Sequence, residues 1–277
     1  MLGRLIKHEW KNTCGMGGLL LGAMALITII GWLAFQTPMW KSASSGRGSF
    51  GWLDVFGILT LVMYVILLAV VNYGILIYMG VNFYRTMYSD QGYLAHTLPV
   101  TKQELLLGKV LVSSCWMLIL TLSLYLSLFL MGASLISAFL PEGYSLTALW
   151  RELRWNEIIY RIGYELDMDV LRWLFSAFFM SLVTPFTSVC TLFGAISIGQ
   201  LFSKHRVLMA VLCYIGIIFA ENMIGAVVQS MAAMSLISGY GGYMGMRMNS
   251  SFVISLVTAV ILYFVSWYIN EKKLNLE

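Results

Sequence analysis

The chain has 277 residues, of which 60% are hydrophobic and 11% are charged, and its mean hydropathy is +0.82. A soluble domain is roughly half apolar and about a quarter charged, so this composition excludes a water-soluble domain, a disordered chain and a coiled coil. The net charge of +4 comes without a basic cluster, which excludes a nucleic-acid-binding surface. The four cysteines lie in or beside apolar runs, where thiols pack as small hydrophobic groups and do not indicate a disulfide scaffold.

Six apolar stretches are long enough to cross a bilayer, which takes roughly 20 mainly apolar residues. We therefore predict an all-α integral membrane protein with one transmembrane domain over residues 1–277. The predicted spans cover residues 17–35, 53–81, 110–140, 173–202, 207–231 and 252–269. Two long polar segments remain between them, residues 82–109 and residues 141–172.

Lysine and arginine residues near the span ends predict the orientation, because cytoplasmic loops carry an excess of them. The bias favours cytoplasmic termini, a cytoplasmic loop at 82–109 and an external loop at 141–172. In the external loop, four arginines are offset by six acidic residues, and pairs four residues apart predict a helical element there. The inner segments then hold Arg4, Lys7, Lys11, Arg85, Lys102, Lys109, Lys204, Arg206, Lys272 and Lys273.

The chain offers no pattern of catalytic or metal-binding residues. His8, His96 and His205 lie in three separate segments without metal-ligand spacing. The dipeptide at 108–109 fails as a phosphate-binding loop, because Val110 stands where Ser or Thr is needed. We predict no catalytic, cofactor-binding or metal-ligating residue, and no enzyme activity in this chain.

The first residues form an amphipathic pattern at helical spacing, with basic residues on the opposite face. Such a helix is typical of a segment that lies in the membrane interface. It would anchor the first span, with or without a second role as a docking surface for a cytoplasmic partner. The predicted anchor residues are Leu2, Leu5, Ile6 and Trp10.

The segment 82–109 combines aromatic and charged residues with a glycine break. Thr101 and Glu104 have the spacing of a capping box, which predicts the start of the next helix. Pro99 blocks continuation of any preceding helix. These features predict a short helix or turn that lies across the spans at the inner membrane surface.

The run Gly92-Tyr93-Leu94-x-x-Thr97-Leu98-Pro99-Val100-Thr101, with Lys109 after it, resembles the first cytoplasmic loop of bacterial ABC-transporter permeases of the type-two exporter class. The opening residues 5–11 are similar to the N-terminal connecting helix of that class. Six spans with both ends inside agree in layout over the whole chain. One feature departs from the pattern: members often carry their external helices between the last two spans, and here the larger external element is 141–172.

The resemblance implies the permease subunit of an ATP-driven exporter in the bacterial cytoplasmic membrane, with a peptide or an antibiotic as substrate. Separate cytoplasmic ATPase subunits would bind ATP and magnesium, and a second permease copy or homologue would complete the pathway among membrane lipids. The loop between the second and third spans would be a coupling helix that docks on the ATPase. Carried over by position, its contact residues are Asp90, Gln91, Gly92, Tyr93, Leu94, His96, Thr97 and Leu98.

Glu221 is the one ionisable residue deep inside a predicted span, and Asn222 and Gln229 continue the polar character of its helix. An ionised group at mid-membrane costs at least about 2.5 kcal/mol unless it is paired or hydrated. These residues predict either a translocation path or an interhelical hydrogen bond. Two other functions stay open for the chain: a self-energised secondary transporter or channel, and a membrane-embedded sensor or assembly factor.

Overall fold

The structure is a computed structural model that describes residues 2–35, 52–89, 92, 101–139, 151, 154–165, 170–202, 205–236 and 243–272. The described residues form α-helices and no strand, as the composition predicts. The helices are α1 (Leu2–Phe35), α3 (Trp52–Met87), α5 (Lys102–Phe139), α7 (Trp155–Glu165), α8 (Val170–Gly199), α9 (Arg206–Leu236) and α10 (Tyr243–Lys272).

Six of these helices, all except α7, have the length and hydropathy of a membrane span. The number of spans is the number that the sequence predicts, and the chain is a multi-pass membrane protein. The short helix α7 lies in the segment between the third and fourth spans, where the sequence predicts a helical element.

The helices extend beyond most of the predicted span ends. Helix α1 begins at Leu2 rather than at residue 17, so the predicted interfacial helix and the first span are one continuous helix. Helices α3 and α5 likewise include residues 82–87 and 102–109 of the predicted loop. Hydropathy marks the stretch that matches the hydrocarbon layer, whereas a helix continues wherever its polar residues find partners.

The chain divides into two compact units. The second unit comprises Thr13–Ile75 and Ile119–Ile158, and its polar centre is the buried Ser127 hydroxyl of α5. This hydroxyl forms hydrogen bonds with Tyr64 at 2.6 Å and Thr28 at 2.7 Å. Hydrogen bonds between side chains of different helices stabilise packing where apolar surface alone gives no preference over lipid.

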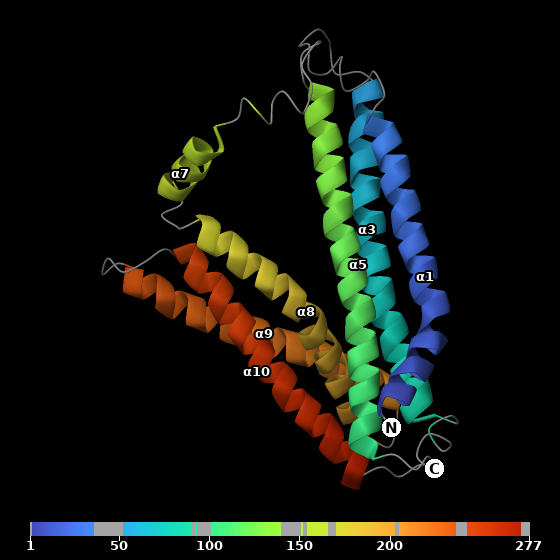
Figure 1. The fold of residues 1–277 in the computed structure, drawn as a ribbon. Helices are drawn as coiled ribbons and strands as arrows, with labels where there is room; N and C mark the ends of the chain where they lie inside the picture. Colours follow the sequence, from blue (N-terminus) through green and yellow to red (C-terminus); the bar gives the residue numbers. More distant parts are fainter. Residues whose placement is uncertain are drawn as a thin grey trace. The chain divides into compact units, whose positions relative to one another are not determined.

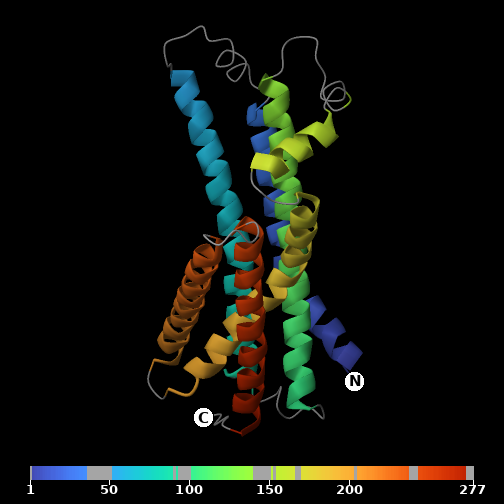
Figure 2. The same cartoon turned by 90° about the vertical axis from the view of Figure 1, so that its left-hand side faces the viewer.

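The first unit comprises Met1–Asn12, Leu76–Leu118 and Ile159–Glu277. In it α8, α9 and α10 pack together, as Figures 1 and 2 show. Two glycines of α8 permit close approach. A Cβ on Gly194 would lie 2.6 Å from the Cβ of Leu262, and one on Gly199 would lie 2.6 Å from the backbone of Ala210.

Candidate functional site: the helix ends beside the coupling loop

A buried ion pair joins the beginning of α1 to α5 in the first unit. Lys109 Nζ lies 2.5 Å from Glu9 Oε1 and donates a second hydrogen bond to Thr86 Oγ1 at 2.8 Å. The two charged side chains are only 4% and 13% exposed. A buried charge is tolerated only with partners of this kind. The ion pair and the bond to Thr86 therefore hold α1, α3 and α5 together at this point.

A second polar cluster joins both flanks of the predicted coupling loop to one residue. On the first flank, Tyr88 Oη donates to Asn270 Oδ1 at 2.7 Å. On the second flank, Lys102 Nζ donates to the main-chain oxygen of Asn270 at 3.0 Å. Asn270 is completely buried near the end of α10. The two sides of the loop are therefore held by the same turn of α10.

The Tyr88 hydroxyl is a neutral donor. Burial raises its pKa far above the ordinary value of 10, and its hydrogen bonds with Ser197 and Asn270 lower it by less. Since Tyr88 gives its single proton to Asn270, the 2.8 Å hydrogen bond with Ser197 has the serine hydroxyl as its donor. The donor and the acceptor of each hydrogen bond in this cluster are thus defined. Ser197 connects the cluster to the end of α8.

The capping box that the sequence predicts at the start of α5 is confirmed. Glu104 N donates to Thr101 Oγ1 at 3.2 Å, and Thr101 N donates to Glu104 Oε2 at 3.3 Å. This reciprocal pair satisfies two amides at the start of the helix. It ends the loop at a defined residue.

Of the predicted ATPase contacts, Gly92 is described: it is buried, and its amide donates to the main-chain oxygen of Ser89 at 2.6 Å. The bond lies shortly after the end of α3 at Met87. The other predicted contacts lie outside the described residues: Asp90, Gln91, Tyr93, Leu94, His96, Thr97 and Leu98.

The predicted anchor residues pack on the protein. Trp10 stacks on Trp116 of α5 with 4.8 Å between ring centroids, and a Cβ on Gly108 would clash with the side chain of Leu5. Leu2 and Ile6 are half-buried, whereas the basic residues of the opposite face are exposed. The apolar stripe of this segment therefore contacts α5.

The three predicted path residues line one pocket of about 170 Å³ between α9 and α10. Thr258 of α10 donates to Glu221 Oε1, and Gln229 Nε2 donates to Ser251 Oγ at 3.2 Å. Asn222 instead bonds to its own helix, at the main-chain oxygen of residue 218.

The α10 side of this pocket was not predicted from the sequence. The polar residues on that side are Ser251 and Ser255, with Thr258 one turn further on. The spacing is four residues from the first serine to the second and three from there to the threonine. In the sequence, this pattern is a polar stripe on one face of an otherwise apolar helix, and it could have indicated the α10 side of the pocket.

Within the described part of the chain, no group of three or more His, Cys, Asp or Glu residues is placed to hold a metal ion. Comparison of the chain with protein-family models, with curated proteins and with solved structures found no match.

Proposed function

We propose that this chain is the membrane-spanning subunit of an ATP-driven exporter of the ABC type, with both termini in the cytoplasm. Two copies, or one copy and a homologue, enclose the translocation pathway, and separate cytoplasmic subunits bind and hydrolyse ATP. A peptide or an antibiotic is the substrate class that fits the resemblance. In this proposal the loop between α3 and α5 is the contact with the ATPase.

The observation that supports this proposal is the attachment of both loop flanks to Asn270. A loop that merely joins two spans needs no such fixation. A loop that transmits force must be rigidly connected to the helices that it moves, and Tyr88, Lys102 and Asn270 provide connections to α3, α5 and α10. Closure of the ATPase subunits would thus displace several helices together.

The polar pocket of Glu221 is the feature that a second candidate function, a self-energised transporter, would use. Such proteins place ionisable groups and broken helices at their binding sites. Here α9 is continuous through Glu221 and α10 is continuous through Thr258. We therefore assign this pocket to the pathway of the ATP-driven exporter.

The proposal is tested by purifying the tagged full chain from its own membranes and measuring ATP hydrolysis in the preparation. We expect an ABC ATPase subunit, identified by mass spectrometry, to accompany the wild-type chain. Aspartate at both Tyr93 and Leu94 should remove this subunit and the vanadate-sensitive hydrolysis, because two new charges would oppose an apolar docking contact.

The matched control places aspartate at Tyr160 of α7, an aromatic residue that is 74% exposed and belongs to the predicted external element. This control should retain both the subunit and the hydrolysis. Absence of any ATPase from the wild-type preparation, or equal hydrolysis in the loop variant, would refute the proposal.

A further inference from the structure

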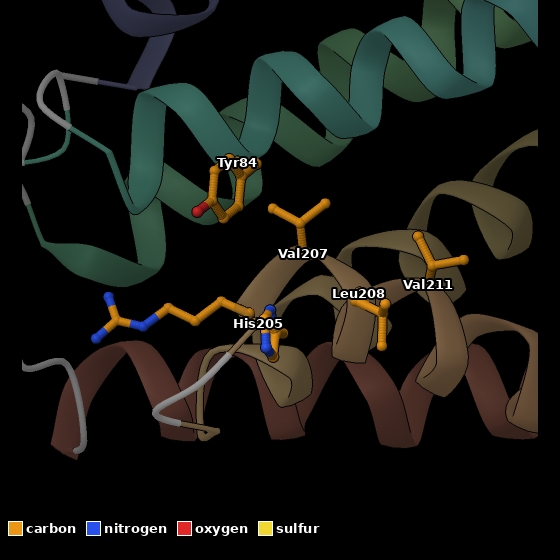
Figure 3. Close-up of a pocket in the computed structure, with 6 residues that line it drawn as sticks. Tyr84, His205, Val207, Leu208 and Val211 are labelled. Atoms are coloured by element: carbon orange, nitrogen blue, oxygen red, sulfur yellow. The ribbon is translucent and has the colours of Figure 1, made fainter.

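A groove lies in the first unit between the end of α3 and the beginning of α9. Its volume is about 740 Å³, and it is lined by Tyr84, His205, Arg206, Val207, Leu208 and Val211. Figure 3 shows Tyr84 and Val207 on opposite sides of the space, with Leu208 and Val211 following along α9. Residues from two helices that are far apart in sequence therefore form one surface.

The groove has a polar end and an apolar side. Arg206 and His205 supply the cationic and imidazole groups, and Tyr84 adds a hydroxyl. Val207, Leu208 and Val211 leave between 52% and 58% of their surface exposed along the helix. An elongated site with this polarity matches an amphiphile with an anionic head group.

The backbone of the α8–α9 turn contributes to the polar end. His205 has a φ of 56°, in the left-handed region, and its main-chain oxygen accepts the amide of Met209. It is thus the residue from which α9 starts. The first amides of a helix have no acceptor inside the helix, and they favour negative charge. Arg206, Val207 and Leu208 provide these first amides of α9, and all three residues line the groove.

We propose that this groove binds an anionic phospholipid, with the phosphate at Arg206 and an acyl chain along Val207, Leu208 and Val211. Basic pockets between membrane helices bind anionic head groups in this way. The apolar residues continue directly from the basic end along a membrane-spanning helix, so one molecule can occupy both parts. The inference does not depend on the proposed export function, since it rests on the groove alone.

The test uses the full chain, delipidated in detergent and titrated with phosphatidylglycerol or with phosphatidylcholine. Native mass spectrometry counts the retained lipids, and thermal unfolding measures the stabilisation. We expect the wild type to retain phosphatidylglycerol in preference to phosphatidylcholine. Arg206→Gln should lower phosphatidylglycerol retention by about fivefold or more, since a cation near an anionic membrane surface contributes about 1 kcal/mol.

A second variant and a matched control separate the groove from general surface charge. Val211→Trp fills the apolar side without a change of charge and should also lower phosphatidylglycerol retention. Lys7→Gln removes the same charge from an exposed position outside the groove and should retain the wild-type preference. Thermal unfolding in phosphatidylcholine should be unchanged in all three variants, which shows that they fold.

Two outcomes would overturn the proposal. One is a wild-type lipid preference in the Arg206→Gln chain. The other is equal loss in Arg206→Gln and Lys7→Gln, which would indicate attraction by the basic surface as a whole.

Discussion

Lys109 illustrates how a charge is kept inside an apolar protein. Its amine is 4% exposed, yet it contacts a carboxylate and a hydroxyl, and the carboxylate of Glu9 is also largely buried. Removal of one partner breaks this ion pair and leaves the other charged group buried in a medium of low polarity. The stability of the pair thus depends on both members together.

We predict that Lys109→Met destabilises the chain by roughly 3–5 kcal/mol, because it takes the ion-pair partner from the largely buried Glu9 carboxylate. The double variant with Glu9→Gln removes the negative charge as well and should recover most of the loss. The free energy of unfolding in mixed micelles measures both effects. A double variant as unstable as the single one would show that packing at Lys109, rather than charge, is what matters.

Glu221 is a second residue whose role is tested by two substitutions. Thr258 donates to it, but the single proton of that hydroxyl also has two alternative acceptors, main-chain oxygens of its own helix at 3.0 and 3.1 Å. The threonine therefore does not depend on Glu221 for a partner. This favours the pathway interpretation of Glu221 over a purely structural bond.

We predict that Glu221→Gln lowers transport-linked ATP hydrolysis in the assembled complex, while its unfolding free energy stays within about 0.5 kcal/mol of the wild type. The amide oxygen still accepts from Thr258, but the ionisable group is lost. Glu221→Leu should cost only about 1 kcal/mol, at the low end for a lost hydrogen bond. Full hydrolysis in the Gln variant with a strongly destabilised Leu variant would assign Glu221 to packing.

Among the elements, α8 and α9 approach each other closely, backbone to backbone, at a glycine. A Cβ on Gly199 would meet the nitrogen and Cα of Ala210 at 2.6 Å, and backbone atoms cannot move aside without a shift of the whole helix. Gly216 of α9 offers the matched comparison, because a Cβ there would have nothing within 4 Å.

We predict that Gly199→Ala destabilises the chain by roughly 1–3 kcal/mol, the usual cost of an overpacked contact. Gly216→Ala should be neutral or stabilising by up to about 1 kcal/mol, because alanine is the better helix former. Thermal and denaturant unfolding of the two variants gives the comparison. A neutral result at Gly199 would mean that the two helices separate at little cost.

The sequence predicts elements better than it predicts the contacts between them. The number of spans follows from apolar length, and the capping box at Thr101 follows from a spacing of three residues. The partner of Lys109 does not follow, because Glu9 lies 100 residues away and no local pattern encodes that distance. The sequence analysis also treats the N-terminal helix and the first span as separate elements, whereas α1 is continuous from Leu2 to Phe35.

Spans that cross a membrane in alternating directions bring every second helix end to the same side. Within the first unit, helix ends that belong to the same side are in contact. The beginnings of α1 and α5 meet at Glu9 and Lys109, and the ends of α3, α8 and α10 meet at Tyr88. This end also carries many of the lysine and arginine residues, which is typical of the cytoplasmic side.

We predict that a cysteine at Arg4 reacts only with a membrane-permeant thiol reagent in intact cells, and that a cysteine at Tyr160 reacts with an impermeant one. Both side chains are exposed, so access depends on the side of the membrane alone. The experiment starts from a chain in which Cys14, Cys115, Cys190 and Cys213 are replaced by serine or alanine. The opposite labelling pattern would reverse the topology and remove the basis of the coupling assignment.

The fixation of the loop by Asn270 also has a consequence in time. Lys102 and Asn270 are 168 residues apart, and a ribosome adds roughly 5–20 residues per second. The second flank of the loop is therefore synthesised roughly 10 to 30 seconds before the residue that holds it exists. Until α10 has entered the bilayer, neither flank has its Asn270 bond, and the ATPase partner of the proposed exporter would meet an unfinished surface. If the proposal holds, synthesis of the last span sets the earliest moment at which a competent complex can assemble.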